Sequence, residues 1–313
     1  MTEYLTRTFK ITLFTIAFFC FSAVCLSQNK RDIFIKNEVQ PLLNSQDISD
    51  AEYKQLKTAI LTLEKEYGYE TNLKKRLLEI AYIHKDVDFF KAELSMLVKE
   101  YGFDVAYMRE TESYYPAIMK GELAAWFKTM YLKNHMEWLN NNFDKQIELR
   151  KLNTIHEKDQ FITRFAMNVL AISSLDSLEQ AAVKDKLSEY YLSNISPLLE
   201  SASKRGIFIN EGNFAVLQNG YDTALIHNFQ FQRNMDTVWS KLFPYIKKSY
   251  GQNEITNVIF QNYDFYHYQH YGSQVFDSYT YDEIREQFRQ KQNPIPTKDR
   301  AWLDAFKKEF GWK

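Results

Sequence analysis

The sequence predicts an all-α protein, with stacked helical hairpins over residues 28–197 and a smaller, mainly helical domain over residues 198–313. One reason is that apolar residues recur every three or four positions through most of the chain, which is the period of an α-helix. A second reason is an octet that returns after a fixed interval: residues 63–70 are LEKEYGYE and residues 97–104 are LVKEYGFD. Such an internal repeat is typical of arrays of stacked helical units.

The first element of the chain is an uncharged apolar run over residues 11–26, with two basic residues shortly before it and small or polar residues after it. This pattern is typical of a secretory signal peptide. We therefore expect a signal peptide over residues 1–27, cleavage after Ser27 and an exported protein in the periplasm or outside the cell. A membrane-spanning helix needs about 20 apolar residues, and the run is slightly shorter. An uncleaved anchor through residues 11–26, or a lipid on Cys25, is the alternative.

Composition restricts the class of partner. Both cysteines, Cys20 and Cys25, lie in the predicted signal peptide, so the mature chain would depend on its core rather than on disulfides. The formal net charge is −1 and no block of Lys and Arg stands out. Because phosphate binding depends on clustered positive charge, we expect no nucleic-acid partner. After cleavage of the signal we also expect no membrane span.

The repeated octet belongs to two longer segments, Leu56–Glu70 and Phe90–Asp104, that align over their whole length. In both, apolar residues three or four positions apart mark one face of an amphipathic helix. They are Leu56, Ile60, Leu63 and Tyr67 in the first copy and Phe90, Leu94, Leu97 and Tyr101 in the second. Gly68 and Gly102 follow each helix, where a left-handed residue commonly ends the last turn. Ser49 and Glu52 fit a capping box at the start of the first copy.

Residues 73–84, between the copies, are also helical by spacing, and Lys85-Asp86 is a turn. Each unit is therefore helix, turn, helix, with a period of 34 residues. This arrangement resembles a tetratricopeptide-type repeat, although the small residues typical of that family are only partly present, with Ala81 the best example. The alternative is a helical hairpin array outside that family. In both cases neighbouring hairpins must stack to bury their apolar faces.

Further helices are expected in both halves of the chain. They are Gly121–Leu139, Asp159–Leu170, Leu178–Tyr191, Tyr221–Gln232, Met235–Ser249 and one amphipathic helix near the C-terminus. The aromatic segment over residues 263–281 fits either a helix end or a short β ribbon.

One segment of the second half resembles a known family. Residues 269–274, QHYGSQ, are similar to the Gln-x-Tyr-Gly-Thr-Gln signature of the bacterial family of unknown function numbered 6624. Gly206 and His227 match a glycine and a helical histidine of that family in order and rough spacing, and the resemblance covers residues 198–311. The chain departs from the family around the histidine, which is followed by Asn-Phe rather than Ala-Asp. In the family an Asp-Arg pair normally precedes the signature, and in this chain only Asp264 matches that pair. The resemblance implies a fold and no established activity.

The candidate site residues lie around this signature. The candidate binding residues are Asp264, Gln269, Tyr271, Gly272 and Gln274, and the candidate catalytic residue is His227. A histidine oriented by an amide and a phenol can transfer protons near neutral pH. The alternative is structural: a buried, hydrogen-bonded histidine, and glutamines that bond to loop backbone. We also expect Gly272 at positive φ, with the two glutamines bonding across the turn.

Asp264, His267 and His270 follow one another at three-residue spacing. On a helix they would lie within about 120° of one another, and two imidazoles with a carboxylate are a common ligand set for zinc or iron. On a strand the two histidines would face opposite ways. These three residues are the candidate ligands, and our expectation is that the chain has no metal site and no cofactor.

No motif specifies a reaction. The sequence has no Gly-x-Ser-x-Gly, no His-Glu-x-x-His and no phosphate-binding glycine loop. Aromatic residues are 16% of the chain and tyrosines are dense over residues 263–281, and exposed tyrosines favour binding surfaces. We therefore expect an exported, non-enzymatic binding protein with a protein or glycan partner in the cell envelope. The alternative is a small hydrolase-like enzyme with a pocket formed by His227, Gln269, Tyr271 and Gln274.

Overall fold

The computed structural model describes residues 30–45, 47–171, 175–210, 220–252 and 254–312. Over these ranges the fold is all-α, as predicted, and the only β pairing is an isolated bridge between Gln274 and Thr297. The first helices are α2 (Lys30–Phe34), a π-helical turn (Ile35–Val39), α3 (Gln40–Leu43), α4 (Asp50–Tyr67), α5 (Thr71–Ile83), α6 (Val87–Tyr101), α7 (Tyr115–Met119) and α8 (Ala124–Asn141). They are followed by α9 (Phe143–Leu170), α10 (Ser177–Asn194), α11 (Ser196–Arg205), α12 (Gly220–Phe229), α13 (Gln232–Gly251), α14 (Val258–Tyr271) and α15 (Arg300–Phe310).

The two copies of the repeat form α4 and α6, which confirms the predicted hairpin array. The predicted apolar positions are fully buried in both helices: Leu56, Ile60 and Leu63 in α4, and Phe90, Leu94 and Leu97 in α6. The last residue of each face, Tyr67 in α4 and Tyr101 in α6, is only partly buried. Helix α5 contacts both α4 and α6, so the three helices stack in chain order.

The ends of these helices follow from local sequence. The Ser49 hydroxyl accepts a hydrogen bond from the backbone of Glu52, whose carboxylate accepts from the Ser49 N–H at 2.8 Å, so the capping box is present. Gly102 ends α6 in the left-handed region, with φ of 67°, and Gly68 ends α4 at φ of 95°. Both positions favour glycine because a side chain at positive φ is strained.

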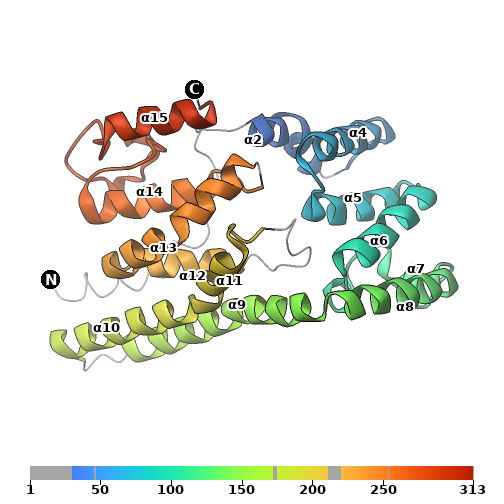
Figure 1. The fold of residues 1–313 in the computed structure, drawn as a ribbon, viewed down its shortest axis with the longest axis horizontal. Coiled ribbons are helices and arrows are strands. Elements are labelled where there is room, and N and C mark those ends of the chain that lie inside the picture. The colour runs from blue at the N-terminus through green and yellow to red at the C-terminus, as the bar shows by residue number, and fades with distance from the viewer. Residues whose placement is uncertain (1–29, 46, 172–174, 211–219, 253, 313) are drawn as a thin grey trace.

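Helices α8 and α9 follow each other along one edge of the molecule, and α10 folds back beside α9 (Figure 1). Helix α9 begins at Phe143, so the predicted start at Asp159 was wrong. Leu149, Leu152 and Ile155 continue the helical spacing on the N-terminal side of Asp159 and are buried. Helices α10, α11 and α12 all pack against this long helix.

The aromatic segment of the second half is helical. Helix α14 includes residues 263–271, so the alternative of a β ribbon there was wrong, and the residues after Gly272 continue as loops and 3₁₀ turns. The predicted helix over Tyr221–Gln232 ends earlier, at Phe229, and α13 begins at Gln232. These helices pack with α15 into a layered group (Figure 1).

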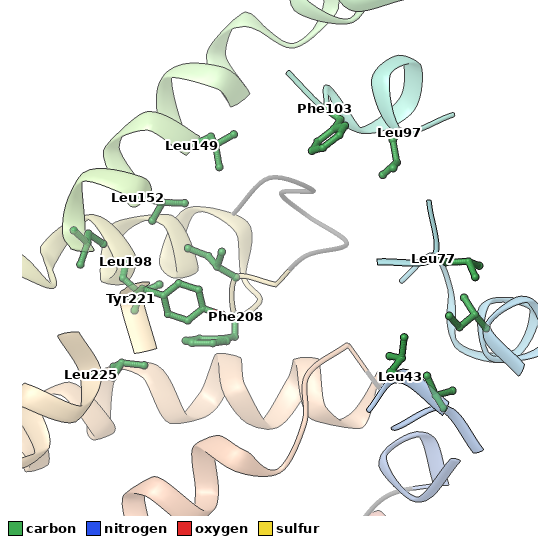
Figure 2. Close-up of a cluster of buried hydrophobic side chains, with 14 of the residues drawn as sticks. Leu43, Leu77, Leu97, Phe103, Leu149, Leu152, Leu198, Phe208, Tyr221 and Leu225 are labelled. Carbon is green, nitrogen blue, oxygen red and sulfur yellow. The ribbon is translucent and has the colours of Figure 1, made fainter. Parts of the chain in front are cut away.

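One hydrophobic core extends from Val39 to Trp312 and therefore continues across the domain boundary proposed between residues 197 and 198. Buried side chains of α3, α5 and α6 and of α9, α11 and α12 belong to this core, and Figure 2 shows them as two groups. The beginning of the described chain also meets its second half, because the Asn257 N–H donates to the Asp32 carboxylate at 3.2 Å. Arg31, next to Asp32, forms a two-contact ion pair with Glu70 in the turn between α4 and α5.

None of the helices in the described ranges combines the length and apolar character needed to cross a membrane. The predicted signal peptide over residues 1–27, the alternative anchor over residues 11–26 and both cysteines lie outside the described residues.

Candidate functional site

The signature segment lies at the end of α14. Gly272 stops this helix in the left-handed region, at φ of 71°, and donates its N–H to the Tyr268 carbonyl at 2.9 Å. A Cβ atom at this position would lie 3.0 Å from the Gln290 side-chain oxygen. Both the dihedral angle and the close approach therefore favour glycine, as predicted. The chain can turn sharply here and pass back along α14.

Asp264 anchors the loop that follows this turn. Its carboxylate is fully buried and accepts hydrogen bonds from the N–H groups of Val275 at 2.7 Å, Phe276 at 3.0 Å and Ser278 at 3.0 Å. Burial raises the pKa of Asp264 to about 6, and the backbone hydrogen bonds oppose that shift. Because its oxygens are already bonded to backbone, Asp264 acts as a structural anchor rather than as a contact for a ligand.

The two signature glutamines also form hydrogen bonds with backbone groups. Gln274 is buried, donates to the Tyr279 carbonyl at 2.8 Å and accepts from the Tyr279 N–H at 3.0 Å. Gln269 donates to the Phe288 carbonyl at 2.9 Å. Gln274 thus bonds across the loop, as expected, while Gln269 reaches a more distant 3₁₀ turn. These contacts fit the structural alternative, in which amide side chains satisfy backbone groups of loops.

The two nearby histidines point to different partners. His267 donates from Nδ1 to the Ser273 carbonyl at 2.6 Å, and His270 donates from Nε2 to the Phe229 carbonyl, at the end of α12, at 2.8 Å. A nitrogen that donates a proton in this way is not available as a metal ligand. Within the described ranges, no group of three or more His, Cys, Asp or Glu side chains could hold a metal ion. Burial lowers the pKa of His267, which favours its neutral ring.

Tyr271 is the most exposed of the signature side chains, with 41% of its surface accessible. Its hydroxyl donates to the Asp236 carboxylate at 2.5 Å, and its ring lies against the His267 ring with centroids 4.7 Å apart. The hydrogen bond to Asp236 raises the pKa of the phenol. Tyr271 and Asp236 therefore form a fixed aromatic and acidic surface, which we call the Tyr271 patch.

His227 belongs to a different cluster. Its Nδ1 lies 2.9 and 2.8 Å from the two oxygens of Asp159, a fully buried residue of α9, and His227 itself is 7% exposed. The Tyr191 ring lies 5.0 Å away, and its hydroxyl shares a hydrogen bond with Thr163. The carboxylate fixes the imidazole so that Nδ1 donates, which leaves the lone pair of a neutral ring on Nε2.

The structure does not bring the predicted pocket together through hydrogen bonds. His227 bonds to Asp159, whereas Tyr271 bonds to Asp236 and Gln274 bonds to Tyr279. Sequence reasoning missed Asp159 because it lies 68 residues from His227. A signal was nevertheless present: a carboxylate one turn after Ile155, on the apolar face of α9, predicts a buried charge that needs a partner.

A second buried polar cluster was also missed. Lys74 of α5 is 1% exposed, and its ammonium lies 2.9 Å from both Glu64 of α4 and Glu93 of α6. Tyr69 donates to Glu93 and its ring lies 5.3 Å from the ammonium. Lys74 thus ties three stacked helices together. Its position one residue after Leu73, between apolar positions of α5, was the available signal.

Comparison with known proteins gave no match to a family model, a curated protein or a solved structure. The resemblance of residues 269–274 to the family of unknown function, and of the first half to tetratricopeptide-type repeats, therefore stays a prediction. Gly206, the other matched glycine, ends α11 in the left-handed region at φ of 66°. Its role here is a helix stop, like that of Gly272.

Proposed function

We propose that this protein is exported and acts as a binding protein without a catalytic step, with a protein or a glycan of the cell envelope as its partner. The observation that carries the proposal is the Tyr271 patch. The signature residues around the patch form hydrogen bonds with backbone groups, and Tyr271 is the one among them with an exposed side chain. Exposed, rigid aromatic rings are enriched where proteins bind partners.

The chemistry of the patch suits either partner. The ring can pack against an apolar side chain or the apolar face of a sugar, and the neighbouring Asp236 carboxylate can accept hydrogen bonds from amides or hydroxyls. The patch is fixed before any partner arrives, since the phenol bonds to Asp236 and the ring rests on buried His267. A site that is ordered in advance loses less entropy on binding.

The test is a comparison of two matched tyrosine variants. Tyr271→Ala and Tyr190→Ala remove rings of nearly equal exposure, 41% and 40%, from α14 and α10. Each variant is immobilised and incubated with separated protein and polysaccharide fractions of the native envelope. The proposal expects that wild-type protein and Tyr190→Ala retain the same component and that Tyr271→Ala loses it. Equal retention by all three forms would contradict the role of the patch.

Export is tested separately, by N-terminal sequencing of the protein from the envelope fraction. We expect the mature chain to begin at Gln28. An intact Met1 or a lipid on Cys25 would contradict the proposed cleavage.

The Asp159–His227 pair favours a second candidate function, a small hydrolase-like enzyme with His227 as general base. In such enzymes a carboxylate orients the histidine, as Asp159 does here. The two candidates are separated by screening wild type and His227→Gln against ester, amide and glycoside substrates. Hydrolysis by wild type that His227→Gln lacks, with both forms folded, would support the enzyme and remove the binding proposal.

A further inference from the structure

The Tyr271 patch is a single exposed ring in polar surroundings. Among the described residues between 221 and 312, the other large apolar side chains of comparable exposure are Val258 and Trp302. Val258 begins α14 and Tyr271 ends it, so the two lie about 20 Å apart along the helix. Trp302 belongs to α15, where its ring contacts Phe243 and Phe276. The patch therefore has no second large apolar group beside it in this part of the chain.

This isolation makes a protein partner a poor fit. A protein interface of standard size buries about 800 Å² on each side and has an apolar centre inside a polar rim. The surface of α13 beside Tyr271 is polar and carries the exposed residues Gln232, Arg233, Asp236 and Ser240. One ring on such a surface suits a small polar ligand with one apolar face. A sugar residue has this character.

The Tyr271 ring is held in one orientation with a face free for contact. One side of the ring lies against the His267 ring, with centroids 4.7 Å apart, and the hydroxyl donates to Asp236 at 2.5 Å. With 41% of the residue accessible, the side away from His267 faces solvent. The C–H groups of a pyranose ring form a flat apolar surface that matches such an aromatic face. Stacking at this position requires no rearrangement of the protein.

Two planar polar groups lie beside the ring. Gln232 and Asp236 are one helical turn apart on α13, so their side chains are neighbours. The Gln232 amide approaches the Tyr271 phenol as a second hydrogen-bond partner, next to Asp236. An ionised carboxylate has about four acceptor positions, and the phenol is the one partner of the Asp236 carboxylate among the described residues. The remaining positions can accept hydrogen bonds from two adjacent hydroxyl groups.

We propose that the Tyr271 patch binds an uncharged sugar residue that carries two adjacent free hydroxyl groups, as part of a glycan of the cell envelope. This assignment rests on the proposed function and selects the glycan over the protein as the partner. The Tyr271 ring stacks on the C–H face of the sugar, and the Asp236 carboxylate accepts a hydrogen bond from each of the two hydroxyls. The Gln232 amide donates to a neighbouring sugar oxygen.

The charge of the patch restricts the class of sugar. Asp236 forms no ion pair within the described part of the chain, so its carboxylate repels uronic acids and other acidic sugars. Arg233, the cation next to Gln232 in sequence, interacts with Glu189 of α10. Because a single ring contacts a single sugar residue, binding is weak, with a dissociation constant on the order of 1 mM.

Substitutions at position 271 test the stacking. The assay is retardation of the purified protein in native gels that contain the protease-digested polysaccharide fraction of the envelope. Tyr271→Trp keeps a flat ring and should bind within about threefold of wild type. Tyr271→Leu keeps an apolar side chain without a flat face, so its binding should weaken by about tenfold or more. Equal binding by wild type and Tyr271→Leu would contradict stacking on a sugar.

The same gels test the polar contacts. Asp236→Ala removes the hydroxyl acceptors and should weaken binding by about tenfold, and Gln232→Ala should weaken it by roughly threefold. Asp88→Ala is the matched control, because it removes the same charge from an exposed position of α6, and its binding should stay within about twofold of wild type. Equal retardation of wild type by polygalacturonate, an acidic polysaccharide, would contradict the choice of an uncharged sugar.

Periodate oxidation separates a glycan from a protein, because periodate cleaves the bond between carbons that carry adjacent hydroxyl groups. The envelope component that immobilised wild type retains and Tyr271→Ala loses should survive protease digestion and disappear after periodate. A component destroyed by protease overturns the glycan and assigns the patch to a protein, while the proposed binding function stands. A component that survives both treatments contradicts the adjacent hydroxyls. If no component distinguishes wild type from Tyr271→Ala, the proposed function itself fails.

Discussion

Replacing Leu97 by Ala tests the stacked hairpins most sharply. Leu97 is fully buried in α6 and belongs to the core that includes Leu56, Leu77 and Phe90. Leu→Ala removes three carbon atoms, which corresponds to about 2.4 kcal/mol of lost transfer free energy at about 0.8 kcal/mol per carbon. The cavity left behind adds to this cost, and buried Leu→Ala variants lose about 2–5 kcal/mol. We expect a loss near the middle of that range.

The repeat supplies a matched second variant. Leu63 occupies the equivalent position of α4 and is also fully buried, so Leu63→Ala should lower the free energy of unfolding by a similar amount. Met96, next to Leu97 on α6, is 45% exposed. Met96→Ala should therefore cost about 1 kcal/mol or less. Urea unfolding followed by tryptophan fluorescence measures all three losses. A loss below about half a kcal/mol for Leu97→Ala would show that the repeat does not form a core.

Three further predictions concern the second half and the first helix. Gly272→Ala should lower the free energy of unfolding by about 1–2 kcal/mol, measured by urea unfolding, because Gly272 has positive φ; an unchanged value would contradict the strained turn. Asp159→Ala should lower the free energy of unfolding by about 3 kcal/mol, because it leaves His227 buried without its partner. The double variant Asp159→Ala with His227→Phe should recover part of that loss. Strictly additive losses for the two substitutions would refute the pairing. Burial raises the pKa of Asp32 from about 3.8 to about 6, so the folded chain binds the proton of this carboxyl more tightly than the unfolded chain does. The resulting contribution to the free energy of unfolding is fully present below pH 3.8, approximately, and is lost as the pH rises through about 6. Between pH 7 and pH 5 wild type should therefore gain about 1 kcal/mol relative to Asp32→Asn, and equal pH profiles would contradict the shift.

Local patterns of the sequence predicted most of the first half. Positions three and four residues apart identified the buried faces of α4 and α6, and Gly68 and Gly102 marked their ends. These features depend on residues close together in the chain, so their physical causes can be recognised without the fold. The buried ammonium of Lys74 was not predicted, because its partners Glu64 and Glu93 come from two other helices.

The second half was harder to predict because tertiary packing outweighs local preference there. Tyrosine and phenylalanine favour strands, yet the segment is helical in α14. That helix is buried on several sides, from Phe260 to Tyr268, so no simple amphipathic face marks it. The partner of His227 was not predicted for a related reason, since Asp159 is far away in sequence and its buried charge is compensated only in the folded chain.

The central claim is that the signature residues form a scaffold and that Tyr271 alone makes the contact. Thermal melts and partner binding of Gln274→Ala, compared with Tyr271→Ala, test this most directly. Gln274 is buried and bonds twice to Tyr279, so Gln274→Ala should lower the free energy of unfolding by about 1–2 kcal/mol while the folded protein still binds. Tyr271→Ala removes the hydrogen bond to Asp236 and the ring contact with His267, so it should lower the free energy of unfolding by about 1 kcal/mol. The folded Tyr271→Ala protein should nevertheless lose the partner. A Gln274→Ala protein that melts like wild type but no longer binds would contradict the claim.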